Sequence, residues 1–351
     1  LRPEAWIAET VNLGFDLRFA RDRDNMKFLV GHGDAAVRRG DQVGQLSAYP
    51  AHLALVAAVR RDLAMARHAA RFVASILMCP QWHQSFQCVA PGIGWDHRSY
   101  TQSLIAFNIV TVVDLFSELF TPLSHEVILR RLAIDVIGQI NWTTYKWDYI
   151  FANNSLHLFT VGRMAAAIHL TKTLPRAAGE IDQAYADAAA NLDRLILPDG
   201  GYDEGPGYLN EMLRAYLMAM HLYARARNQP FEAGLHPSLF TINDYVEAVA
   251  STDENRYFMP LCDGARSDQE IFDHFGLMAR LMPDSVWTRL YAKYRAQTRG
   301  LPTEVFDFLG APDPRSVAPY SLRPFVELPH TGYCASLREL GGEWLKLLIL
   351  G

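Results

Sequence analysis

The feature that most constrains the fold is the spacing of apolar residues between about residues 50 and 300. They recur at three- and four-residue steps, the period of an amphipathic helix, and strand-like alternation is scarce there. The runs with this spacing are 53–78, 100–119, 126–139, 155–174, 181–196 and 209–226. Breaks rich in Pro and Gly separate them, at 79–80, 91–92, 121–122, 198–207 and 229–230. The sequence therefore predicts a mainly α protein of stacked helical hairpins.

Helix pairs that each bury one face against their neighbours form solenoids or close into rings. The number and length of the runs lead us to expect an (α/α) toroid over residues 1–320, although no tight internal repeat supports the closure. With 351 residues, half of them hydrophobic, the chain can bury a core of the required size.

The C-terminal stretch lacks the helical spacing and has the pattern of β-strands. Residues 324–351 read as two strands joined by the turn Gly341-Gly342. Two strands alone are marginally stable in water, so we expect residues 321–351 to begin an antiparallel β-sandwich and the chain to be truncated at Gly351.

The amino-acid composition limits the kinds of ligand and environment that suit this protein. Charged residues make up 20% of the chain and the net charge is -5, so no overall basic field favours nucleic acid, and recognition of an acidic ligand must be local. Charged residues interrupt even the apolar run 53–78, so we expect no membrane span. The four cysteines lack the C-x-x-C spacing of structural zinc sites, and no metal or other cofactor is expected. The oligomeric state is left open.

The segment richest in chemistry is PDGGYDEGPGY at 198–208, which holds four glycines, two prolines, two tyrosines and three carboxylates. Such loops often hold functional side chains on a rigid scaffold. A long connection built only from turn residues is the structural alternative. We interpret the segment as a site, with Tyr208 as a candidate and with Tyr202 and Glu204 as candidate substrate-binding residues.

The segment WDYIFANNSLH at 147–157 places Asn153 and Asn154 at the start of a helix and His157 one turn further on. An N-cap explains one asparagine, but not both together with His157.

Aromatic residues with polar neighbours suit contact with sugar rings. Trp95 and His97, in GWDHRSY at 94–100, are candidates for such a contact. A similar group contains Trp142, Tyr145 and Trp147.

Three segments together resemble the heparinase II/III-like polysaccharide lyases, a group that includes alginate lyases and is related to uronate epimerases. They are DGGYDEGPGY at 199–208, NNSLH at 153–157 and PLCDGARSD at 260–268. The loop is the most specific of the three, and the resemblance extends from about residue 82 through the C-terminal strands. It implies a toroid followed by a β-sandwich, with an acidic, uronate-containing polysaccharide in the cleft between them. It also implies cleavage by β-elimination. We favour a periplasmic or secreted location and leave a cytoplasmic one open.

The resemblance also implies residue roles. Tyr208 matches the tyrosine that acts as base and acid, and Asn154, with Asn153 beside it, matches the residue that neutralises the uronate carboxylate. Some relatives carry His directly after this asparagine, where this chain has Ser155, so His157 fills that role only if its helix turns it inward. A further histidine of the family comes from the sandwich, beyond the residues of this chain.

The chemistry explains why such residues are needed. The C5 proton of a uronate is removable only when the carboxylate is neutralised by preorganised donors, and the amide of Asn154 or a ring N–H of His157 can donate. Tyrosine titrates near pKa ~10, so a tyrosine base needs a nearby positive charge. Arg163 and Arg214 are the candidates.

Three alternatives stay open. A glycoside hydrolase would use two of Asp199, Asp203 and Glu204 as general acid and base. A uronate C5-epimerase would return the proton rather than expel the 4-oxygen. A glycan-binding protein without turnover would rely on its tryptophans.

Overall fold

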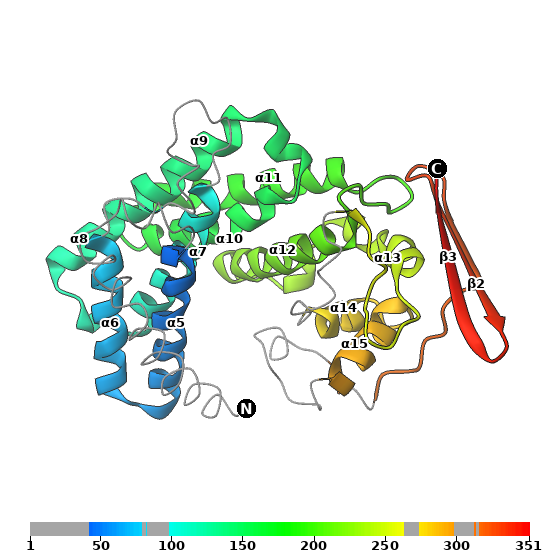
Figure 1. The fold of residues 1–351 in the computed structure, drawn as a ribbon. Coiled ribbons are helices and arrows are strands. Elements are labelled where there is room, and N and C mark those ends of the chain that lie inside the picture. The colour runs from blue at the N-terminus through cyan, green and yellow to red at the C-terminus, as the bar shows by residue number, and fades with distance from the viewer. Residues whose placement is uncertain (1–41, 79–81, 83–97, 263–273, 298–311, 314–315) are drawn as a thin grey trace. The chain divides into compact units, whose positions relative to one another are not determined.

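The computed structural model describes residues 42–78, 82, 98–262, 274–297, 312–313 and 316–351. This part of the chain is mainly helical and ends in a small antiparallel sheet, as expected (Figure 1). The main helices are α5 (Gln42–Arg60), α6 (Leu63–Met78), α7 (Arg98–Leu115), α8 (Pro122–Arg131), α9 (Gln139–Lys146), α10 (Ser155–Thr171), α11 (Ala178–Leu195), α12 (Gly205–Arg227), α13 (Asn243–Val249), α14 (Phe275–Leu281) and α15 (Val286–Gln297). Among the described residues, no helix is long and apolar enough to cross a membrane.

The chain forms two compact units. Unit 1 contains the described residues up to Ile150, together with Ser155–Ala186 and Arg225–Arg227. Unit 2 contains Phe151–Asn154, Asp187–Ala224 and the described residues from Asn228 to Gly351.

In unit 1, α7 packs against α5 and α10. The helices α7 and α10 approach closely at Gly162, whose backbone N–H donates to the hydroxyl of Ser103 at 2.9 Å. A Cβ at Gly162 would lie 2.2 Å from the Cα of Ser103. Only glycine fits this crossing without a shift of the backbone.

Residues 53–78, expected as a single run, belong to two helices, so that prediction was wrong. Between α5 and α6, Arg61 takes a left-handed conformation with φ 56°. The carboxylate of Asp62 then accepts a hydrogen bond from the backbone N–H of Met65 at 3.0 Å, as an N-cap does. The apolar period runs on through this break, which is why the period alone does not reveal it.

The run 126–139 is part of a longer helical stretch. It begins at Pro122, where the Thr121 hydroxyl accepts from the backbone N–H of Ser124 at 3.2 Å. It continues through a π-helical segment, Leu132–Gly138, and ends with α9 at Lys146.

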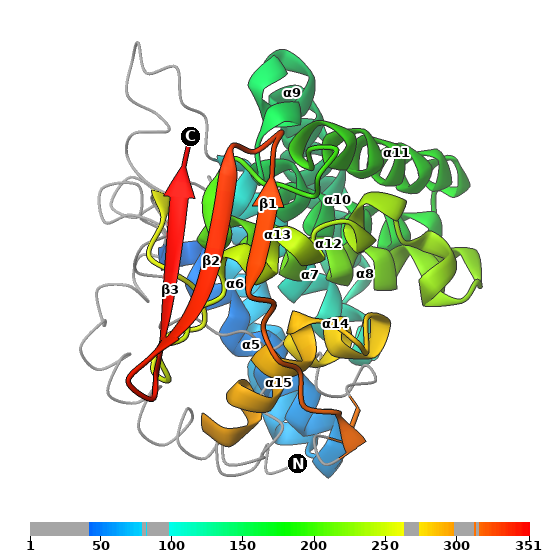
Figure 2. The ribbon, with the colours of Figure 1, turned by 90° about the vertical axis from the view of Figure 1, so that its right-hand side faces the viewer.

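The sheet of unit 2 has three strands in the order β1-β2-β3, all antiparallel (Figure 2). They are β1 (Phe325–Leu328), β2 (Tyr333–Leu340) and β3 (Glu343–Leu350). The prediction of two strands was wrong, because a turn that ends at Gly332, with φ 74°, divides the first expected strand. The turn at Gly341-Gly342 is confirmed, and both glycines have positive φ.

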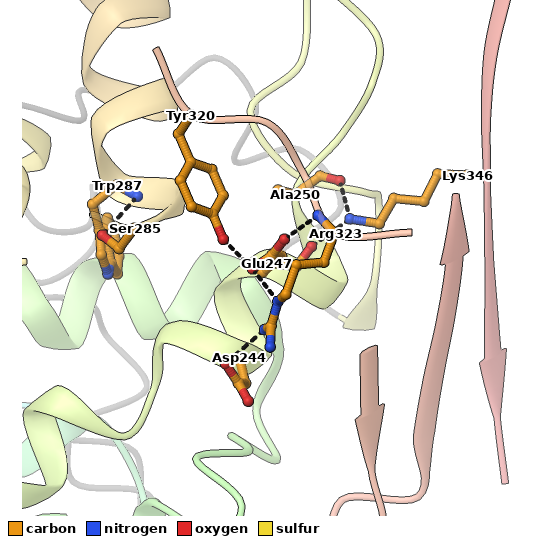
Figure 3. Close-up of polar contacts among 8 residues, drawn as sticks. All are labelled: Asp244, Glu247, Ala250, Ser285, Trp287, Tyr320, Arg323 and Lys346. Atoms are coloured by element: carbon orange, nitrogen blue, oxygen red, sulfur yellow. Dashed lines mark hydrogen bonds and ion pairs between the residues drawn. The ribbon is translucent and has the colours of Figure 1, made fainter. Parts of the chain in front are cut away.

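A buried carboxylate ties this region to α13, which packs against β1 and β2. Glu247 is fully buried and accepts hydrogen bonds from the Tyr320 hydroxyl at 2.7 Å and from Nε of Arg323 at 2.8 Å (Figure 3). Arg323 also pairs with Asp244 at 2.6 Å. Lys346 of β3 donates to the backbone carbonyl of Glu247 and, at 2.9 Å, to that of Ala250. The strands are thus anchored to α13 by polar contacts as well as by packing.

Candidate functional site

The glycine-rich segment is shorter as a loop than expected, because α12 begins at Gly205. Tyr208 therefore lies in the first turn of a helix. Gly205 has φ 87°, and a Cβ there would lie 2.8 Å from the Cβ of Cys262. Glycine tolerates the positive φ and has no Cβ to collide with Cys262. Pro206, directly after it, suits the first helical turn. Tyr208 is 37% exposed.

Glu204 brings three of the predicted residues together within unit 2. Its Oε2 accepts a hydrogen bond from the backbone N–H of Asn154 at 2.8 Å and another from the Tyr202 hydroxyl at 2.9 Å. Tyr202 is fully buried. Burial raises the pKa of Glu204, while these two hydrogen bonds oppose the rise. The pKa of Tyr202 is raised by burial and by the neighbouring Glu204 carboxylate. The predicted role of Glu204 in substrate binding stays a prediction, and the contacts described here are internal.

Asn153 and Asn154 precede α10, and both are held through their backbones. The side chain of Asn191 donates to the carbonyl of Asn153 at 3.1 Å, and Glu204 holds Asn154. Asn154 is buried, and its side-chain amide makes no hydrogen bond to another described residue. The Asn154 backbone is therefore held by Glu204, while the side-chain amide keeps its donors for a ligand.

His157 and Arg163 lie on α10 in unit 1. His157 is fully buried. Arg163 is also buried; its Nε pairs with Glu180 at 2.5 Å, and another guanidinium nitrogen donates to the Tyr145 hydroxyl at 3.0 Å. These contacts hold the Arg163 guanidinium inside unit 1.

Arg214 is exposed on α12, six residues after Tyr208. Helix geometry places it about 9 Å further along the axis and about a third of a turn around it. Its charge acts on His274, which is fully buried and donates from Nε2 to the Asn210 side-chain oxygen at 3.1 Å. Burial first, and Arg214 second, lower the pKa of His274 to about 3.

Asp199 anchors the loop to the turn between β1 and β2. Its carboxylate accepts four hydrogen bonds: from the backbone N–H groups of Gly201, His330 and Thr331 and from the Thr331 hydroxyl. Burial alone would raise the pKa of Asp199, but these hydrogen bonds outweigh it and lower the pKa. The predicted alternative role of Asp199 in hydrolysis would require this anchor to open.

Two tyrosines that the sequence analysis missed lie near the loop. Tyr245 is fully buried, its hydroxyl has no hydrogen-bond partner among the described residues, and its ring centroid is 6.0 Å from that of Tyr333. Burial raises the pKa of both phenols, and Asp203 adds to the effect. No local pattern indicated this pair, since the two residues come from α13 and β2.

The predicted glycan contacts Trp95 and His97 lie outside the described residues. Within the residues that the structure does describe, no group of three or more His, Cys, Asp or Glu side chains is arranged to hold a metal ion.

The chain matches no protein-family model, no curated protein and no solved structure.

Proposed function

We propose that the protein is a polysaccharide lyase that cleaves a uronate-containing acidic glycan by β-elimination. The observation that carries the proposal is the Glu204 contact, which ties the backbone of Asn154 to the loop that leads into Tyr208. Two of the three segments that resemble the heparinase II/III-like lyases are thereby joined by a direct hydrogen bond. We also propose the finer fold that this resemblance predicts, an (α/α) toroid followed by the first strands of a β-sandwich.

In the proposed reaction, the side-chain amide of Asn154 donates to the uronate carboxylate and stabilises the charge that develops when C5 loses its proton. The Tyr208 phenolate takes that proton. The electron pair left on C5 forms the C4–C5 double bond as the C4–O bond breaks, and the new Tyr208 phenol protonates the leaving oxygen. Arg214 keeps its predicted role on the phenolate.

The carboxylates of the loop favour elimination over hydrolysis. A hydrolase needs two carboxyl groups that reach the substrate. Asp199 accepts four internal hydrogen bonds and Glu204 accepts two. Asp203 is exposed, but a single carboxylate does not make the acid and base pair.

The test is the ultraviolet absorbance of an unsaturated uronate, followed on alginate, heparan-type, chondroitin-type and hyaluronan-type polymers. We expect one polymer class to give a rise, and Tyr208→Phe to reduce its rate roughly 10³-fold. Tyr223→Phe, on the same helix, is the matched control and should keep the rate. Reducing ends without absorbance would indicate a hydrolase, and exchange of the C5 proton without cleavage would indicate an epimerase.

A further inference from the structure

A surface patch in unit 1 combines aromatic rings with a lysine. We call Trp142, Tyr145, Lys146, Trp147 and Tyr149 the aromatic platform; they lie at the end of α9 and the start of the short helix η5 (Asp148–Ala152). Trp142 is 45% exposed, Tyr145 is 52% exposed and Tyr149 is 40% exposed. Large rings gathered at the surface mark binding sites more often than single exposed ones do.

The lysine of the platform lies against two indoles. The Lys146 ammonium is 3.9 Å from the ring centroid of Trp142 and 4.7 Å from that of Trp147. The ring quadrupoles attract the cation and hold it at the surface. No carboxylate among the described residues forms an ion pair with Lys146. Within the described part of the chain, the platform therefore presents a positive charge that no carboxylate neutralises.

Part of the platform is held rigid from beneath. The Tyr145 hydroxyl accepts a hydrogen bond from Arg163, and Arg163 is fixed by its ion pair with Glu180. The ring of Trp147 packs near that of Tyr149, with centroids 6.3 Å apart. A surface ordered before binding loses little entropy when a ligand arrives.

Exposed aromatic faces suit the C–H face of a pyranose ring, and an ammonium group suits a carboxylate. A neutral sugar would use the rings and leave Lys146 without a counter-charge. We propose that the aromatic platform is a uronate-binding subsite, in which a sugar ring packs on Trp142 and its carboxylate pairs with Lys146. The inference rests on the proposed function for its ligand class, a uronate. It assigns a binding subsite and no catalytic residue.

The experiment measures calorimetric affinity for a saturated hexamer of uronic acid and for a neutral glucose hexamer, with the full chain carrying Tyr208→Phe to prevent turnover. We expect Trp142→Ala to weaken uronate binding about tenfold, and Lys146→Met about fivefold. Lys146→Arg, which keeps the charge, should stay within about twofold. Trp344→Ala is the matched control, because Trp344 is 59% exposed on β3 in unit 2.

Each outcome decides the inference. Uronate affinity that falls in Trp142→Ala and Lys146→Met, but not in Lys146→Arg or Trp344→Ala, supports the subsite. Unchanged affinity in both platform variants overturns it, as does a parent that binds no uronate hexamer. An equal loss of neutral-hexamer binding in Lys146→Met overturns the carboxylate assignment.

Failure of the subsite and failure of the lyase proposal can be told apart. Platform-dependent binding without any elimination by the wild-type protein would sink the proposed function and leave the subsite standing. Elimination by the wild-type protein, with an unchanged KM in both platform variants, would support the proposed function and overturn the subsite.

Discussion

The carboxylate of Glu204 accepts a hydrogen bond from the backbone N–H of Asn154 at 2.8 Å, across 50 residues of sequence. The same oxygen accepts the hydroxyl of the buried Tyr202 at 2.9 Å. One side chain therefore fixes the residue from which the Asn154 amide projects and also fixes the loop that precedes α12. Glu204 is a positioning residue in this arrangement.

Removing this link should affect both stability and the proposed reaction. Glu204→Ala leaves the Tyr202 hydroxyl and the Asn154 N–H without their acceptor, so we expect a loss of about 2 kcal/mol in the free energy of unfolding. Elimination should slow mainly through kcat, because Asn154 acts on charge that develops in the transition state. Urea unfolding and steady-state kinetics measure the two effects.

Two further variants test whether the acceptor oxygen at position 204 is what stabilises the link. Glu204→Gln keeps an acceptor oxygen and should recover part of both losses. Asp203→Asn changes the neighbouring exposed carboxylate, and its stability should stay within about 0.5 kcal/mol of wild type. A Glu204→Ala protein with wild-type kcat would show that Glu204 does not position Asn154 for catalysis.

The sequence predicts the helices more reliably than it predicts the contacts between them. The apolar residues locate α7, α10 and α12 to within a few residues, because each of these helices buries most of its apolar side chains. The sequence pattern misses the break at Arg61, where the apolar period continues through a turn made by backbone conformation and the Asp62 cap. It also misses the turn before Tyr333, since two short strands in succession look like one long strand.

The site was predictable as a set of residues but not as an arrangement. The loop composition and the paired asparagines pointed to Tyr202, Glu204 and Asn154. That Glu204 binds the backbone of Asn154, rather than a ligand, depends on a pairing between distant segments that no local pattern encodes. The anchoring of Asp199 by the β1–β2 turn is hidden for the same reason.

Acid should destabilise the protein through His274. Its pKa is lowered from 6.5 to about 3 by burial, so between these values the unfolded chain binds a proton that the folded chain does not. Stability from this group is present above pH 6.5 and is lost as the pH falls toward 3. The loss should reach about 2 kcal/mol at pH 5.

Urea unfolding of wild type and His274→Gln at pH 7.5 and pH 5 measures this effect. The glutamine side chain can still donate to Asn210 but does not titrate. The variant should therefore lose less stability than wild type between the two pH values, whatever its stability at pH 7.5. Equal losses in both proteins would show that other groups cause the acid sensitivity.

The two acidic residues of α13 that bind Arg323 should differ in their effect on stability. Glu247 is fully buried and also accepts the Tyr320 hydroxyl, whereas the Asp244 side chain is half-exposed. Glu247→Gln should cost about 2 kcal/mol, because the buried amide accepts less strongly and its NH₂ group needs a partner. Asp244→Asn should cost less than about 0.5 kcal/mol. Thermal unfolding tests this order, and equal effects of the two variants would contradict it.

The crossing of α7 and α10 should tolerate no added methyl group. An alanine Cβ at Gly162 would lie 2.2 Å from both the Cα and the carbonyl oxygen of Ser103, and backbone atoms cannot rotate away as a side chain can. The two helices would have to separate, and the hydrogen bond from Gly162 N–H to the Ser103 hydroxyl would weaken. We expect Gly162→Ala to lower the free energy of unfolding by about 3 kcal/mol.

Gly179 in the first turn of α11 is the matched control. A Cβ there meets nothing within 4 Å, so Gly179→Ala should stabilise the protein by about 0.5 kcal/mol through helix propensity alone. Urea unfolding of the two variants separates steric from conformational effects, since both make the same chemical change inside a helix of unit 1. A Gly162→Ala protein as stable as Gly179→Ala would mean that α7 and α10 do not cross at Ser103 as closely as described.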